Sequence, residues 1–150
     1  MALNLNEYYK KVYNVAFRLT GDELKSVNMA YVAISSAYSD LELTDRVPLN
    51  IFQITAKEIC RLFLLETNYS IEIFKNFEKG FTEKESFQYA LMSLEPLKRT
   101  LIVWIDVLGY KVGDMTETMY TKNELYSELN KARRLIKEIV KNLSLDEVGA

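Results

Sequence analysis

The chain contains no histidine, and this removes the side chain that most often serves as general base, proton shuttle and metal ligand. Cysteine occurs once, at Cys60, so neither an intramolecular disulfide nor a cluster of thiolate ligands can be built. These shortages argue against hydrolytic and metal-dependent chemistry, and the remaining residues show no catalytic constellation. We therefore expect a protein that is not an enzyme and that uses no cofactor or metal.

Long apolar runs are also missing, since no stretch approaches the roughly 18 to 20 residues of a transmembrane helix. The first residues, Met1 to Tyr9, lack both the basic start and the apolar core of a secretory signal. The 19 basic and 21 acidic residues give a net charge of -2, so any attraction to nucleic acid needs a local basic surface. We expect a cytoplasmic protein with no membrane partner, and a single cysteine fits that reducing compartment.

Only 5 glycines and 2 prolines interrupt the chain, and the strong periodicities repeat at the spacing of an α-helix. The sequence therefore predicts an all-helical, all-α fold. A first helix is expected from about Asn4 to Leu19, with one apolar face. That face consists of Leu5, Tyr8, Val12, Val15 and Leu19. The corner from Thr20 to Glu23 has capping-box spacing and starts a second helix. Its apolar seam, expected to pack on the first helix, consists of Leu24, Val27, Tyr31, Ile34 and Tyr38.

Pro48 stands where a third helix would begin, and apolar residues then recur at helical spacing from Leu49 to Leu65. The apolar face of this helix includes Phe52, Ala56, Ile59 and Phe63. Periodicity weakens over 67–81, where asparagine, serine and glycine interrupt a short apolar pattern. We interpret 67–81 as a linker between two small helical domains, residues 1–66 and residues 82–150.

The second half contains two further capping boxes, which mark where helices begin. The first, Thr82 to Glu85, starts a helix through Met92, and Pro96 then opens a helix that runs to Leu108 and ends at Gly109. A short helix is expected near Val112 to Met119. The second capping box, Thr121 with Glu124, begins a long final helix. Its buried residues are predicted to be Leu125, Leu129, Ala132, Ile136, Ile139 and Leu143.

A short helix, a brief turn and a longer helix form the helix-turn-helix arrangement, whose second helix commonly enters the DNA major groove. Helical hairpins with this spacing also occur in other all-helical proteins, so the pattern leaves structural packing open. Five tyrosines recur at helical spacing without interleaved arginine, which favours core packing over a stacking platform for bases. They are Tyr8, Tyr9, Tyr13, Tyr31 and Tyr38. Trp104 and Cys60 are likewise expected in the core.

Ordered landmarks in both halves resemble a known family. From Leu94 to Val140 the chain shows a Leu and Pro opening, an apolar helix ending at Gly109, and a closing LNKAR run from Leu129 to Arg133. These features resemble the promoter-reading C-terminal domain of bacterial RNA polymerase sigma factors of the extracytoplasmic-function kind. The N-terminal stretch YYKKVYNVAFRLTGDELKSVNMAYVAISSAY is similar to the core-binding domain of the same family. The resemblance spans both predicted domains and leaves the linker unmatched.

This resemblance implies that the first domain binds the RNA polymerase core and that the second domain binds promoter DNA. It places polymerase contacts on the second helix, at Asn28, Tyr31 and Val32. The stretch IFQITAKEICRLFLL falls where the family places the helix that touches the opened promoter, with Lys57 and Arg61 as its basic residues. In the long final helix, the implied DNA-binding residues are Lys122, Glu124, Ser127, Lys131, Arg133 and Arg134.

The chain departs from the family pattern in two places. The family's second helix normally presents acidic and amide side chains to the polymerase, whereas neutral or apolar residues stand at the positions matched here. In the long final helix, Glu124 and Glu128 lie one turn apart near the end that should face the groove, where they repel phosphate. Two functions stay open: a sigma-factor-like transcription initiation factor, or a sigma-derived module that contacts another sigma, an anti-sigma factor or the polymerase without binding promoter DNA.

Overall fold

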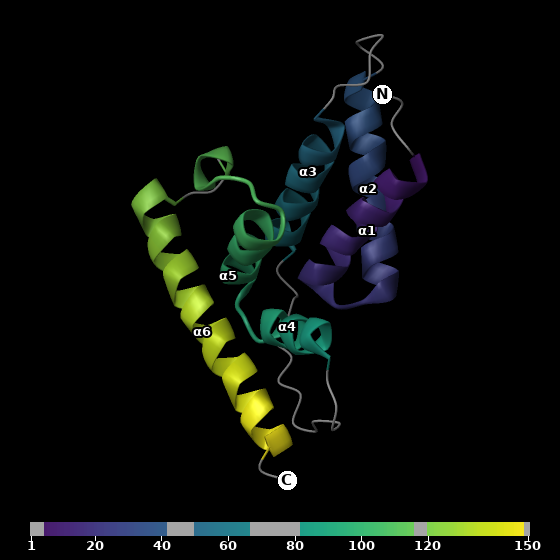
Figure 1. Ribbon diagram of the computed structural model, residues 1–150. Coiled ribbons are helices and arrows are strands. Elements are labelled where there is room, and N and C mark those ends of the chain that lie inside the picture. The colour runs from purple at the N-terminus through teal and green to yellow at the C-terminus, as the bar shows by residue number, and fades with distance from the viewer. Residues whose placement is uncertain (1–4, 42–49, 67–81, 116–119, 149–150) are drawn as a thin grey trace. The chain divides into compact units, whose positions relative to one another are not determined.

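The structure is a computed structural model and describes residues 5–41, 50–66, 82–115 and 120–148 (Figure 1). Every regular element in these ranges is a helix, which confirms the prediction of an all-helical fold. The chain divides into two compact units, Met1–Thr67 (unit 1) and Asn68–Ala150 (unit 2). The predicted linker 67–81 lies outside the described residues, so the predicted domain boundaries stay a prediction.

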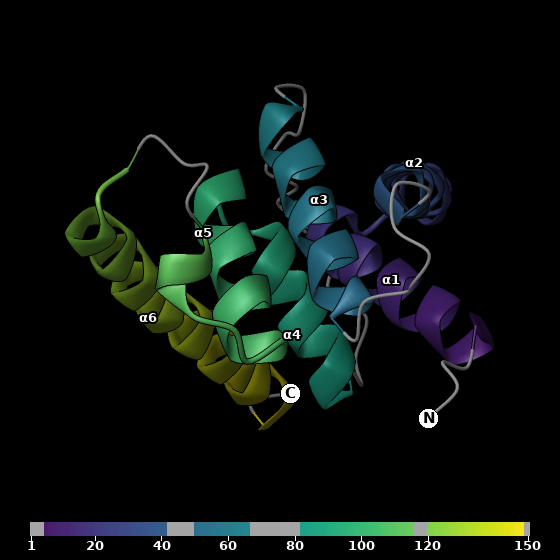
Figure 2. The same cartoon turned by 90° about the horizontal axis from the view of Figure 1, so that it is seen from above.

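The described residues of unit 1 form three helices that all pack on one another: α1 (Leu5–Thr20), α2 (Glu23–Leu41) and α3 (Ile51–Leu65). Figure 2 views α2 nearly along its axis, with α1 and α3 beside it. The corner between α1 and α2 turns at Gly21, whose φ of 64° is a conformation that glycine adopts without strain. Asp22 caps α2, because its carboxylate accepts a hydrogen bond from the Lys25 N–H at 3.0 Å. The cap is thus Asp22 rather than the predicted pairing of Thr20 with Glu23.

The predicted apolar seam of α2 is wrong for three of its five members, whereas Ile34 and Tyr38 are half-buried. Leu24, Val27 and Tyr31 are 78%, 55% and 73% exposed, so they point away from the core. The face of α2 that is buried instead carries small side chains at alternating spacings of four and three residues. Its members are Ser26, Ala30, Ala33 and Ala37. Small side chains let α2 approach its neighbours closely, and the larger Leu24, Val27 and Tyr31 lie on the outside.

All three helices contribute to the core of unit 1, and within it a hydrogen-bonded pair joins α1 to α3. The buried Tyr8 hydroxyl lies 2.5 Å from Thr55 Oγ1, which itself donates to the Ile51 carbonyl at 2.8 Å. Cys60 is buried as predicted, and desolvation raises the pKa of its thiol to about 12, which leaves it unreactive at neutral pH. The prediction that all five tyrosines pack in the core is wrong for two of them, since Tyr9 is 48% exposed and Tyr31 is exposed as well. The predicted core position of Leu5 is also wrong, because α1 begins there and its side chain is exposed.

Unit 2 consists of α4 (Glu83–Met92), α5 (Pro96–Leu101), η1 (Ile102–Val107), η2 (Val112–Asp114) and α6 (Lys122–Val148). The predicted capping box of Thr121 with Glu124 is confirmed, and Thr82 is confirmed as the N-cap of α4. The Glu85 N–H donates to Thr82 Oγ1 at 3.2 Å, and the Glu124 N–H donates to Thr121 Oγ1 at 3.1 Å. Pro96 occupies the first turn of α5, as expected for a residue that lacks an N–H.

The predicted helix from Pro96 to Leu108 changes character partway, because η1 is a π-helix. Trp104 lies in η1, is buried as predicted, and donates its indole N–H to the Lys111 carbonyl at 3.0 Å. Gly109 then ends the helix with a φ of 79°. The predicted short helix near Val112 to Met119 is described only as the single 3-10 turn of η2, and residues 116–119 lie outside the described ranges. The helix-turn-helix therefore stays a prediction.

The long helix α6 packs on α4, α5, η1 and η2, and Figure 1 shows it running beside α5. Four of its six predicted core residues are buried, while Ile136 and Ile139 are half-buried. The buried four are Leu125, Leu129, Ala132 and Leu143. Among the described residues, none of the helices combines the length and apolarity that a membrane span requires.

Candidate interaction surfaces

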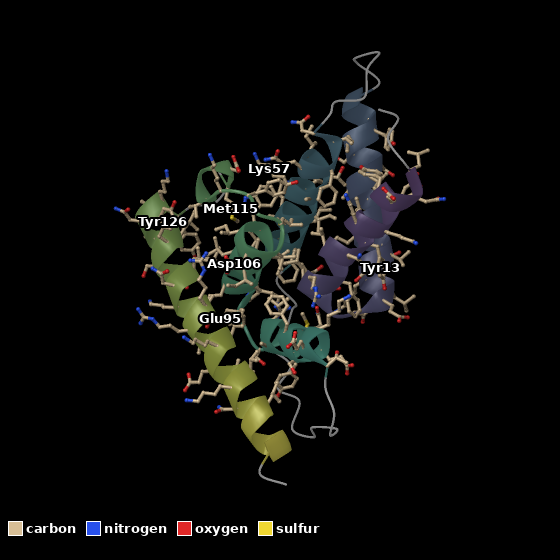
Figure 3. All side chains as sticks on the ribbon, viewed as in Figure 1. Tyr13, Lys57, Glu95, Asp106, Met115 and Tyr126 are labelled. Carbon is tan, nitrogen blue, oxygen red and sulfur yellow. The ribbon has the colours of Figure 1, made fainter. Side chains whose placement is uncertain are left out.

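Two ion pairs join α6 to the preceding helices of unit 2. Lys98 of α5 places its Nζ 2.9 Å from a carboxylate oxygen of Glu128. Arg133 of α6 donates to both carboxylate oxygens of Asp106, at 3.0 Å and 2.6 Å. Figure 3 labels Asp106 on η1, the element from which this carboxylate reaches α6. A two-pronged pair of this kind fixes the orientation of a guanidinium, so Arg133 is held against unit 2.

The ion pair between Lys98 and Glu128 shifts the pKa values of both groups. Its hydrogen bond to Lys98 lowers the pKa of the Glu128 carboxyl, and the same bond raises the pKa of the Lys98 amine. Lys131 adds a second, looser pair with Glu128 at 3.7 Å. The negative charge that the sequence placed against DNA is therefore balanced within unit 2, which weakens its repulsion of phosphate.

Glu124 stabilises the start of α6. Its side-chain oxygen accepts a hydrogen bond from the Thr121 N–H at 3.3 Å and so completes the capping box that begins α6. A carboxylate at this position is stabilised by the positive end of the helix dipole. Glu124 and Glu128 thus both stabilise the fold of unit 2.

The structure places the six predicted DNA-binding residues of α6 on the exposed part of one helix. All six side chains are exposed: Lys122, Glu124, Ser127, Lys131, Arg133 and Arg134. They differ in whether they can bind an outside partner. Arg133 is paired with Asp106, whereas Arg134 makes no ion pair within the described part of the chain. Arg133 is therefore a positioning residue for α6, and Arg134 is available to an outside partner.

On α3 the two predicted DNA-binding residues behave differently from each other. Arg61 is exposed but forms a two-pronged pair with Glu58, at 3.0 Å and 2.5 Å. Lys57 is half-buried, and Figure 3 labels it on α3. The guanidinium charge of Arg61 is paired with the Glu58 carboxylate. A DNA contact by α3 stays a prediction. Within the described ranges, no group of three or more acidic or thiol side chains is arranged to hold a metal ion.

The three residues predicted to contact polymerase are all exposed on α2: Asn28, Tyr31 and Val32. Leu24 and Val27 are also exposed on this helix, and we name Leu24, Val27 and Tyr31 the α2 stripe. Sequence reasoning missed the stripe because its spacing also suits a buried seam. The signal that could have revealed it is the second row of small residues, from Ser26 to Ala37, at the same spacing.

A scan against protein-family models finds no match, and a search of the curated proteins finds no relative. A search of solved structures finds similarity to the sigma factor RpoE, in its co-crystal structure with the anti-sigma factor NepR from Bartonella quintana. The match has 17% sequence identity and a TM-score of 0.62, and it covers 91% of this chain and 94% of that chain. The all-helical fold of this chain is therefore similar to that of a sigma factor over nearly the whole length of both proteins.

Proposed function

We propose that this chain is a sigma-factor-like transcription initiation factor that binds the RNA polymerase core through unit 1 and promoter DNA through unit 2. The observation that carries the proposal is the fold similarity to a sigma factor across 91% of the chain. The proposed protein is a regulator rather than an enzyme. Bacterial RNA polymerase works in the cytoplasm, so the proposal includes a cytoplasmic location.

The α2 stripe supports the polymerase contact. Leu24 and Tyr31 are more than 70% exposed, and neighbouring large apolar side chains on a surface mark sites of protein contact. Burying each of them would contribute about 1 to 2 kcal/mol, scaled from the transfer of a whole side chain by its exposed fraction. This matches the roughly 1.5 to 3 kcal/mol of a charge-assisted hydrogen bond. An apolar contact can therefore replace the acidic side chains that the family usually presents at this helix.

The ion pairs of α6 support the DNA contact. A carboxylate facing the groove is unfavourable when it has no partner, but Glu128 lies 2.9 Å from Lys98 and Glu124 caps its own helix. Ser127, Lys131 and Arg134 remain exposed on the same helix. Glu124 and Glu128 therefore oppose promoter binding less than two unpaired carboxylates would.

A second candidate is a sigma-derived interaction module that regulates transcription without binding promoter DNA. The pairing of Arg133 with Asp106 and of Arg61 with Glu58 favours it, because two cations that DNA contact would use are already occupied. The sigma factor with a similar fold is bound to an anti-sigma factor in its crystal structure. An anti-sigma factor or another sigma is accordingly the expected partner of such a module.

The test is co-elution of the full chain with purified bacterial core polymerase, followed by binding of the complex to promoter fragments. The double variant Leu24→Ser with Tyr31→Ser should abolish co-elution. The matched control, Leu5→Ser with Tyr9→Ser, removes the same residue types from exposed positions on α1 and should co-elute normally. Co-elution without any DNA binding by the complex would favour the interaction module. Absence of co-elution by the unaltered chain contradicts both the polymerase contact and the initiation-factor proposal.

A further inference from the structure

The exposed apolar residues of α2 follow the repeat of a coiled-coil seam. The α2 stripe of Leu24, Val27 and Tyr31 continues, at alternating spacings of three and four residues, to the half-buried Ile34 and Tyr38. A period of 3.5 residues keeps all five on one side of the helix, where a second helix can pack along them. Because α2 is already folded against α1 and α3, a partner meets a preformed surface and no helix has to form on binding.

The surface around the stripe is largely neutral. From Val27 to Ser39 the sequence contains no charged residue, although 27% of the chain is charged. The exposed neighbours of the stripe along this run include Asn28, Val32 and Ser35, which are neutral as well. A strongly acidic or basic partner therefore finds no opposite charge here, whereas an apolar and neutral helix matches the surface.

A second copy of this chain supplies such a helix. In a two-fold symmetric interface both partners use the same patch, so the patch must be complementary to itself. A patch that carries charge of one sign repels its copy, and the neutral run of α2 avoids that repulsion. We propose that two copies of the chain pair through their α2 stripes, with the two α2 helices antiparallel.

The antiparallel direction follows from the charges at the start of α2. Alternate seam positions face each other in such a pair, so Tyr31 packs on Val27 of the second copy and Leu24 packs on Ile34 of the second copy. At a rise of about 1.5 Å per residue, this register keeps the two Glu23 residues about 18 Å apart along the axis. A parallel pair would instead bring each Glu23 beside its own copy. Antiparallel helices also set the positive end of each helix dipole beside the negative end of the other.

The pairing surface is small, which makes the dimer weak and reversible. A stable complex uses about 20 to 30 residues a side, far more than the five seam residues of α2, so we expect a dissociation constant on the order of 100 µM. Such a dimer forms where the chain is concentrated and gives way to a tighter partner. Its regulatory consequence rests on the proposed function: polymerase and the second copy would use the same stripe, so a chain bound to polymerase cannot pair.

The first test is sedimentation equilibrium of the full chain between about 5 and 500 µM. The average mass should rise from that of one chain toward that of two. Tyr31→Glu places a carboxylate in the apolar contact and should raise the dissociation constant at least about 30-fold. The matched control, Tyr9→Glu, alters an exposed tyrosine of α1 and should associate as the unaltered chain does. Circular dichroism checks that both variants keep their helices.

The second test measures the register by disulfide crosslinking. Cys60 does not interfere, because it is buried. When Val27→Cys and Tyr31→Cys chains are mixed and oxidised with diamide, a disulfide-linked dimer should form, since these positions face each other. Leu24→Cys alone should give no such dimer. Its two thiols lie about 15 Å apart along the axis, whereas a disulfide needs Cα atoms within about 7 Å.

Three outcomes overturn the inference: one-chain mass at every concentration, association that Tyr31→Glu does not weaken, or a crosslinked dimer from Leu24→Cys alone. A stripe that serves only a different protein would appear as the first outcome. Excess core polymerase should lower the crosslink yield of the mixed pair. An unchanged yield, with a chain that co-elutes with polymerase, refutes the competition between the two partners. Pairing without any co-elution counts against the proposed function alone, because the mass and the crosslinks are measured without polymerase.

Discussion

The orientation of α2 can be tested by exchanging residues on its two faces. Ala33 is completely buried, whereas Leu24 and Tyr31 are 78% and 73% exposed. Ala33→Leu adds three carbon atoms to a close helix contact, and overpacking of this kind costs about 1 to 3 kcal/mol. Leu24→Ala removes a side chain that is only about one fifth buried. Burial of a whole leucine contributes about 1.5 to 3 kcal/mol, so the cost should be about 0.3 to 0.6 kcal/mol.

Tyr31→Ala should likewise cost less than about 1 kcal/mol, because only about a quarter of the side chain is buried. The assay is urea unfolding followed by circular dichroism, which reports helices of both units. Trp104 is the single tryptophan and lies in unit 2, so its fluorescence follows the unfolding of that unit. A cost above about 2 kcal/mol for Leu24→Ala or Tyr31→Ala, together with a neutral Ala33→Leu, would refute the reasoning. It would mean that α2 buries the face that its apolar residues define.

Three further outcomes are expected. Tyr8→Phe removes the hydroxyl that lies 2.5 Å from Thr55 Oγ1 and should lower the free energy of unfolding by about 0.5 to 1.5 kcal/mol in denaturant titrations. Cys60 should resist alkylation by iodoacetamide in the folded chain and react only after unfolding, because burial raises its pKa to about 12; rapid labelling under native conditions would contradict this, as mass spectrometry can show. Glu128→Gln should lose about 0.2 to 1 kcal/mol of stability at pH 7. Since the pKa of Glu128 is lowered, its contribution is present above the ordinary value of 4.5 and is lost as pH falls below it, so the two proteins should converge in stability at low pH.

Much of the helical framework follows from local signals in the sequence. Thr82 and Thr121 begin helices because each has a glutamate three residues later, and Gly109 ends one because it accepts a positive φ. These features act over a few residues, so a single sequence contains them in full. The same holds for the buried residues of α6, because Leu125, Leu129, Ala132 and Leu143 share one face at helical spacing.

The orientation of α2 could not be predicted in this way. Leu24, Val27 and Tyr31 have the spacing of a core seam, but so do the smaller Ala30 and Ala33 on another face. Apolar periodicity shows that a helix has a face suited to contact. It does not show whether that face meets its own chain or another protein. Where two rows compete, the close approach of neighbouring helices selects the smaller one.

The ion pairs of α6 could not be predicted from the sequence for a different reason. Glu128 looked unpaired because its partner Lys98 is distant in sequence, on another helix. Arg133 looked available because its partner Asp106 is 27 residues away. Pairing across helices depends on how they pack, and the charge pattern of one helix does not contain that information.

The central claim is that unit 1 carries a contact surface for RNA polymerase on α2. The most direct measurement replaces Tyr31 with a photo-crosslinking amino acid in the full chain and identifies what it captures in the presence of purified core polymerase. The claim predicts a crosslink to a polymerase subunit from position 31 and a much weaker one from position 9, which is exposed on α1. Equal labelling from both positions, or no polymerase adduct from position 31, would contradict it.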